Sequence, residues 1–181
     1  MSTLQILALA FFSQPKSDRP IYRLIRRLQP QRIVELGIGN GQRSERIIRL
    51  ARTFGPVHFV GIDMFEGSPP GAPHMSLKKA HQRLAVLGDE VRLIPGDAGS
   101  TLPRRANELT NMDLIIISST QPSASVAVAW SYLPRMLRPT SRVMLETPTT
   151  TDVTSWRLLT AEEVSASAAI SAKSKRTRAA A

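Results

Sequence analysis

Two patterns of hydrophobic residues alternate along this chain. In one, β-branched and large apolar residues follow one another in short runs; in the other, apolar residues recur every three or four positions, as on one face of a helix. The runs predict strands at residues 32–36, 57–62, 91–94, 114–117 and 142–145, and an edge strand at 155–159. The helical spacing predicts helices at residues 21–28, 44–54, 77–87, 102–109 (with Pro103 in its first turn) and 124–137, the last bent or broken near Pro134.

Strands that alternate with helices predict an α/β fold. In such a fold a doubly wound, Rossmann-like parallel sheet is covered by helices on both faces. The run Leu114–Ile117 contains no polar residue, as expected for a strand at the centre of a parallel sheet. We therefore expect a three-layer αβα arrangement.

The length of 181 residues suits one domain. We place this domain at residues 1–164, with helices in residues 1–30 that cover the sheet or a pocket mouth. The apolar run Leu4–Phe12 is too short to cross a membrane. No Lys or Arg precedes it, so a docked amphipathic helix is favoured over a signal peptide. Residues 165–181 have almost no large apolar side chains and are expected to form a disordered basic tail.

The net charge of +10 first suggests an anionic partner such as nucleic acid. Four of the positive charges lie in the tail, at Lys173, Lys175, Arg176 and Arg178. Aromatic residues make up 5% of the chain, and none alternates with the arginines at Arg43, Arg46, Arg49 and Arg52. A solvated basic helix face is therefore favoured over a nucleic-acid surface, because stacking platforms are not visible.

Cysteine is absent from the chain, which excludes disulfides, zinc–thiolate sites and cysteine nucleophiles. Nothing in the composition calls for an oxidising compartment, so we expect a cytoplasmic location. The hydrophobic fraction of 42% is that of an ordinary globular protein and excludes a wholly disordered chain.

A glycine-rich loop joins the first predicted strand to the next helix. Its residues are Gly37, Ile38, Gly39, Asn40 and Gly41. Glycine permits a tight turn and lets a ligand approach the backbone closely, although a plain turn would use the same residues. A dinucleotide-binding loop would need a third glycine where this chain has Gln42. Glu35 precedes the loop, and its carboxylate would repel a pyrophosphate but could hold a cationic amine.

Polar residues also follow the other predicted strands. Asp63, at the end of the second strand, could accept hydrogen bonds from both hydroxyls of a ribose, and Met64 follows it. Asp97 and Ala98 follow the third strand, and Ser118 ends the fourth. Each also has a purely structural interpretation: Asp63 as a cap, Asp97 as a turn residue, and Met64 as packing.

Taken in order, these segments resemble the motifs of the class I S-adenosylmethionine-dependent methyltransferases, over residues 32–146. The resemblance implies that Glu35 and the glycine loop hold the methionine part of S-adenosylmethionine. It also implies that Asp63 binds the ribose, that Met64 packs on the adenine, and that Asp97 and Ala98 meet the adenine edge. Ser118 would line the transfer site. The implied strand order is 3-2-1-4-5, with room for one extra edge strand.

The small-molecule O-methyltransferases of this family are the most similar in pattern. The expected reaction is transfer of a methyl group to an oxygen or nitrogen of a small molecule. The segment Ser118–Pro122 lacks the carboxylates of metal-dependent members, so no catalytic metal is expected. His74, in the Gly/Pro-rich loop after the second strand, is a weak candidate base. The C-terminal part is shorter than usual in the family, and a second subunit could complete the substrate side.

Two other functions stay open. The chain could be a non-catalytic module that binds S-adenosylmethionine or serves assembly. It could also be a nucleic-acid methyltransferase tethered by its basic tail.

Overall fold

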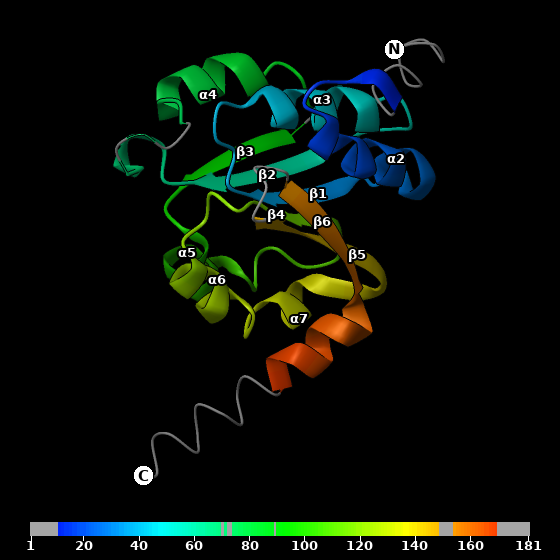
Figure 1. Cartoon of the computed structure of the whole chain (residues 1–181), viewed down its shortest axis with the longest axis vertical. Coiled ribbons are helices and arrows are strands. Elements are labelled where there is room, and N and C mark those ends of the chain that lie inside the picture. Colours follow the sequence, from blue (N-terminus) through cyan, green and yellow to red (C-terminus); the bar gives the residue numbers. More distant parts are fainter. Residues whose placement is uncertain (1–10, 70, 72–73, 89, 149–153, 170–181) are drawn as a thin grey trace.

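A parallel sheet between two layers of helices forms the body of the protein in the computed structural model, which describes residues 11–69, 71, 74–88, 90–148 and 154–169 (Figure 1). The strands are β1 (Arg32–Leu36), β2 (His58–Asp63), β3 (Glu90–Pro95), β4 (Met112–Ile117), β5 (Leu137–Pro148) and β6 (Thr154–Thr160). The α-helices are α2 (Arg19–Leu28), α3 (Gln42–Ala51), α4 (Leu77–Leu84), α5 (Ala98–Arg105), α6 (Ser123–Ala129) and α7 (Leu133–Met136). Two short 3-10 helices are η1 (Lys16–Asp18) and η2 (Phe65–Gly67).

The six strands are ordered β3-β2-β1-β4-β5-β6. Neighbouring strands from β3 to β5 run parallel, and β6 pairs antiparallel with β5. The predicted fold class and the strand order 3-2-1-4-5 are therefore confirmed, together with one extra edge strand. The strand order reverses between β1 and β4, and the carboxyl ends of strands at such a switch point are the usual ligand site of these sheets.

Successive residues of the central strands face opposite layers, because side chains alternate along a strand. Ile33 and Leu114 join the core under α2, α3 and α4. Val34 and Ile115 join the core under α5, α6 and α7. Both layers are visible in Figure 1, one on each side of the sheet.

The helix predicted at 124–137 is divided differently from the prediction. α6 ends at Ala129, and α7 begins at Leu133, so that Pro134 lies in the first turn of a new helix. Proline has no N–H to donate and fits the first turn, so the chain breaks before it. Leu137, expected in the helix, already begins β5.

The helix predicted at 102–109 begins earlier than expected. Asp97 caps α5, which therefore starts at Ala98 and places Pro103 inside the helix rather than in its first turn.

Residues 161–169 are helical, so the expectation of disorder from residue 165 is wrong for the part of the tail that the structure describes. Thr160 and Glu163 form a reciprocal cap: the Glu163 N–H donates to Thr160 Oγ1 at 3.2 Å, and the Thr160 N–H donates to Glu163 Oε2 at 2.7 Å. Val164 is fully buried against the core under α5–α7. Residues 170–181 lie outside the described residues, as does most of the predicted helix Leu4–Phe12, of which residues 11 and 12 are helical.

Candidate functional site

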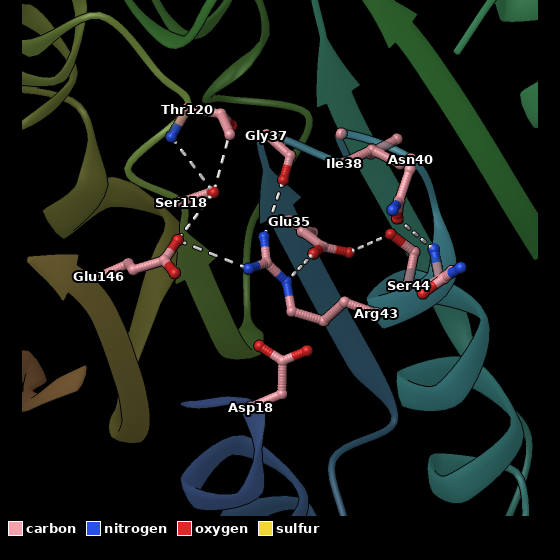
Figure 2. Close-up of polar contacts among 12 residues, drawn as sticks. Asp18, Glu35, Gly37, Ile38, Asn40, Arg43, Ser44, Ser118, Thr120 and Glu146 are labelled. Atoms are coloured by element: carbon pink, nitrogen blue, oxygen red, sulfur yellow. Dashed lines mark hydrogen bonds and ion pairs between the residues drawn. The ribbon is translucent and has the colours of Figure 1, made fainter. Parts of the chain in front are cut away.

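A cavity of about 210 Å³ opens at the carboxyl ends of β1, β4 and β5. Its walls come from η1, from the glycine loop and the first turn of α3, from the segment after β4, and from the end of β5. The lining residues are Pro15, Ser17, Asp18, Gly37, Ile38, Gly39, Asn40, Gln42, Arg43, Ser118, Ser119, Thr120 and Glu146. The cavity therefore lies at the switch point of the sheet, and Figure 2 shows its polar groups.

The glycine loop follows the chemistry expected from its sequence. Gly37, Gly39 and Gly41 all have positive φ angles, of 92°, 61° and 75°. A Cβ on Gly37 would lie 2.5 Å from Thr120 Oγ1, so the loop also depends on close approach to the segment after β4. Gly37, Ile38 and Gly39 line the cavity, whereas Gly41 does not.

Asp63 holds this loop from the neighbouring strand. Its Oδ2 accepts hydrogen bonds from the backbone N–H groups of Ile38, at 2.7 Å, and Gly39, at 3.0 Å. Its Oδ1 accepts from the Phe65 N–H at 2.8 Å. A carboxylate can accept about four hydrogen bonds, so these bonds leave little capacity for the two hydroxyls of a ribose. In this arrangement Asp63 acts first as the residue that shapes the loop.

Glu35 lies below the loop and is fully buried. Ser44 Oγ donates to Glu35 Oε2 at 2.6 Å, and Arg43 Nε donates to Oε1 at 2.8 Å. Burial raises the pKa of Glu35, against the opposing effect of Arg43 and Ser44. Glu35 does not line the cavity, and its carboxylate contacts Arg43 and Ser44 of α3 instead of facing the cavity.

Arg43 does line the cavity, and the sequence pattern misplaced it on a solvated helix face. Besides Glu35, it reaches the Gly37 carbonyl at 2.9 Å and Glu146 at 3.5 Å. Its guanidinium also lies 5.3 Å from the ring centre of Trp156 on β6. Burial acts to lower the pKa of Arg43, but Glu35 and Glu146 outweigh it and raise the value, so the side chain is a permanent cation in the cavity wall.

The cavity wall also contains two carboxylates that the sequence pattern did not predict, Asp18 and Glu146. Asp18, at the end of η1, is buried, and this burial raises its pKa despite the neighbouring Arg43. Glu146, at the end of β5, has a lowered pKa, because the Ser119 N–H, Arg43 and Ser118 together outweigh its burial. Glu146 is therefore ionised at neutral pH, and the cavity contains charges of both signs.

Ser118 lies where the sequence placed it, at the end of β4 and in the cavity wall. Its hydroxyl donates to Glu146 Oε2 at 2.9 Å, and the Ser119 N–H donates to the same oxygen at 3.0 Å. The segment after β4 thereby fixes Glu146 in the cavity wall, and Figure 2 shows its contacts with Ser118 and Arg43.

Asp97 is the N-cap of α5 and has no place in the cavity wall. It accepts hydrogen bonds from the N–H groups of Gly99 and Ser100, at 2.9 and 3.1 Å, from Ser100 Oγ at 2.7 Å, and from Ser125 Oγ. These bonds outweigh burial and lower the pKa of Asp97. Three of these donors bind Oδ1 and one binds Oδ2, so the capacity of Asp97 that is left for an adenine amino group is on Oδ2.

Ala98, Met64 and His74 are the remaining predicted residues. The Ala98 N–H donates to Gln121 Oε1 at 2.8 Å, which ties the start of α5 to the segment after β4. Met64 is half-buried just before η2, and His74 is exposed. None of the three lines this cavity.

Comparison by sequence gives no match to a protein-family model or to a curated protein. Comparison by structure gives matches to solved methyltransferases. The O-methyltransferase TomG from Streptomyces achromogenes, solved in complex with SAM, superposes with a TM-score of 0.56 at 20% identity, over 81% of this chain and 65% of TomG. A putative caffeoyl-CoA O-methyltransferase from Staphylococcus aureus superposes with a TM-score of 0.55 at 19% identity, over 80% of this chain and 66% of that one.

This chain has the class I methyltransferase fold. The SAH-bound methyltransferase PaMTH1 from Podospora anserina shares it, with a TM-score of 0.52 at 20% identity, over 80% of this chain and 53% of that one. The chain thus spans less than two thirds of the length of these methyltransferases. Among the described residues, no group of three or more His, Asp or Glu side chains could hold a metal ion, and no helix is long and apolar enough to cross a membrane.

Proposed function

We propose that this protein binds S-adenosylmethionine and transfers its methyl group to an oxygen or nitrogen of a small molecule, without a metal ion and in the cytoplasm. The observation that carries the proposal is the cavity at the switch point between β1 and β4, where a glycine loop faces an arginine and two carboxylates. The shared fold is consistent with this function.

The charges of the cavity fit the methionine end of the cofactor. A zwitterionic amino acid needs a cationic partner for its carboxylate and an anionic partner for its ammonium group. Arg43 supplies the first, because a guanidinium has five N–H groups and only three of them face Glu35, Gly37 and Glu146. Asp18 and Glu146 supply the second and also favour a sulfonium cation.

The adenosine end fits less directly. Asp63 has room for about one further hydrogen bond, while Asp97 has four donors already. We therefore propose that Asp63 contributes to the ribose site mainly by shaping the loop, and that Ala98 and Met64 contribute to the adenine site by packing.

The cofactor, when bound, supplies an electrophilic methyl group. The protein then has to hold and align the two reactants, and such positioning accounts for a large part of the rate of reactions of this kind. Glu146 is too acidic to be an effective base at neutral pH, since its pKa is lowered. Its proposed task is to orient an N–H or O–H group. His74, which is exposed and lies outside this cavity, is the candidate base.

A non-catalytic module that binds the same cofactor is the second candidate. It is favoured by the dense pairing of the cavity wall: Arg43 binds Glu35 below the wall and contacts Glu146 in it, and Glu146 also accepts from Ser118.

Titration calorimetry with S-adenosylhomocysteine tests the cofactor site. We expect binding by the wild-type protein and at least about tenfold weaker binding by Gly37→Ala, whose Cβ would meet Thr120. Gly71→Ala is the matched control, because Gly71 also has a positive φ, of 82°, but open space around its Cβ position. Absence of binding by the wild-type protein would reject the proposal.

A second measurement separates the enzyme from the module. Turnover of S-adenosylmethionine with a panel of small phenols and amines, in the presence of EDTA, supports the metal-independent enzyme. Binding without turnover across the panel supports the module.

A further inference from the structure

A second cavity lies next to the first. It has a volume of about 340 Å³ and is formed by the ends of β4 and β5 and by α6. Its lining residues are Ile117, Ser118, Ser119, Gln121, Ser123, Val126, Ala127, Trp130, Leu145 and Glu146. This volume falls within the range of small-molecule sites, about 300–1,000 Å³.

Three residues belong to both cavities. Ser118, Ser119 and Glu146 line each of them and so form the partition between the two. The partition is held together by hydrogen bonds to Glu146 Oε2, from Ser118 Oγ at 2.9 Å and from the Ser119 N–H at 3.0 Å. A molecule in the second cavity would therefore have its polar end close to a molecule in the first.

The second cavity differs from the first in chemistry. Apart from the partition, its larger apolar side chains are Ile117, Val126, Trp130 and Leu145, which make an apolar slot with one aromatic wall. Gln121 and Ser123 are neutral polar residues of the same lining, and Gln121 Oε1 already accepts a hydrogen bond from the Ala98 N–H. Glu146 is the single charged residue among those that line it, and it is anionic. Such a site favours a planar apolar body and disfavours a phosphate or a carboxylate, since like charges repel at short range.

We propose that the second cavity binds the methyl acceptor, and that this acceptor is a small planar apolar compound with an amine or hydroxyl donor at one end and no negative charge. The role of acceptor rests on the methyltransferase function proposed above, whereas the binding itself does not. The donor group would lie against Glu146 and Ser118, and the apolar body against Trp130 and Val126. A polyanionic acceptor such as nucleic acid does not suit this cavity.

Ligand-observed saturation-transfer NMR with tyramine tests the site, and 4-hydroxyphenylacetate is the matched anionic probe. We expect tyramine to bind at least about fivefold more tightly than the anion, because of the charge of Glu146. In Glu146→Gln this preference should fall below about twofold. Equal affinity of the wild-type protein for the two probes, or no binding of tyramine, would overturn the proposal.

Two variants of α6 locate the bound probe. Ala127→Phe places a ring in the second cavity, and we expect at least about tenfold weaker tyramine binding. Val128→Phe adds a similar ring at the next position, which is exposed and outside the lining of both cavities, and should bind as the wild type does. Unchanged binding by Ala127→Phe would overturn the proposal.

S-adenosylhomocysteine distinguishes the two proposals. Tyramine that is displaced by S-adenosylhomocysteine and that binds Ala127→Phe as tightly as the wild type would lie in the first cavity, which contradicts the second site. Tyramine that binds at the second cavity while S-adenosylhomocysteine does not bind at all would support the second cavity and reject the proposed function.

Discussion

Glu35 and Arg43 form a buried ion pair, and Arg43 makes further contacts that Glu35 does not share. Glu35 is fully buried, and its partners within reach are Arg43 and Ser44. Arg43 also contacts Gly37 and Glu146, so the same guanidinium holds the glycine loop to the end of β5. At the scale of single residues, the geometry of the first cavity therefore rests on one arginine.

Replacing Arg43 tests this dependence. Arg43→Met leaves the Glu35 carboxylate buried without a cation, and such loss of a buried partner typically costs about 3–5 kcal/mol. The free energy of unfolding in urea should fall accordingly at pH 8. Arg49→Met is the matched control on α3, since Arg49 is exposed and Glu45 keeps Arg83 as a partner, so the loss should cost less than about 0.5 kcal/mol.

The free energy of unfolding that is lost in Arg43→Met should also depend on pH. Burial already raises the pKa of Glu35, and removal of Arg43 removes an effect that lowers it. A carboxyl whose pKa is higher in the folded state contributes stability below its unfolded pKa, and this contribution disappears as the pH rises through the folded pKa. The difference between wild type and Arg43→Met should therefore be smaller at pH 5 than at pH 8. A difference independent of pH would contradict the assignment.

At the scale of elements, the helix at residues 161–169 illustrates how short local signals define a boundary. Thr160 and Glu163 have the spacing of a capping box, and Val164 follows them into the core. The prediction from composition placed disorder from residue 165 because Ala and Ser dominate there. Composition averages over many residues and does not detect a cap that depends on two.

Removal of this cap gives a measurable effect. Thr160→Ala deletes the acceptor for the Glu163 N–H and should lower the free energy of unfolding by about 1 kcal/mol. Ser165→Ala removes an exposed hydroxyl of the same helix and should stay within about 0.5 kcal/mol of the wild type. Equal effects of the two substitutions in urea unfolding would show that the cap has no special role.

The sequence predicted the sheet better than the site. Strand order followed from the alternation of strands and helices together with the family resemblance, and Gly37, Ile38, Gly39 and Ser118 do line the cavity. Arg43 was missed because helical periodicity groups it with solvent-facing arginines, while its partner lies eight residues away on a strand. Asp18 and Glu146 were missed because no local pattern shows that η1 and β5 meet at the same edge.

At the scale of the whole molecule, one sheet separates two cores that share its strands. Trp156 packs with the core under α2–α4, and Trp130 with the core under α5–α7. Every central strand contributes side chains to both cores. If the strands come apart on one side, the core on the other side therefore loses its side chains as well. Unfolding should therefore be a single cooperative transition.

The two tryptophans allow the unfolding transition to be measured separately in each of the two cores. Trp156→Phe leaves Trp130 as the reporter, and Trp130→Phe leaves Trp156. In each variant, the urea midpoint from tryptophan fluorescence should coincide with that from far-UV circular dichroism. A fluorescence transition that precedes the circular dichroism transition in one variant would show that its layer unfolds independently.

The antiparallel direction of β6 determines where the molecule can be attached to a surface. β6 begins opposite Pro148 and ends at Thr160, which pairs with Arg142 near the amino end of the parallel strands. The helix at 161–169 therefore starts near the amino end of the parallel strands, about 13 Å along β6 from Trp156, which pairs with the cavity residue Glu146. A linker that continues from this helix leaves β6 at the end away from Glu146, so an immobilised protein should keep both cavity mouths accessible to ligands in solution.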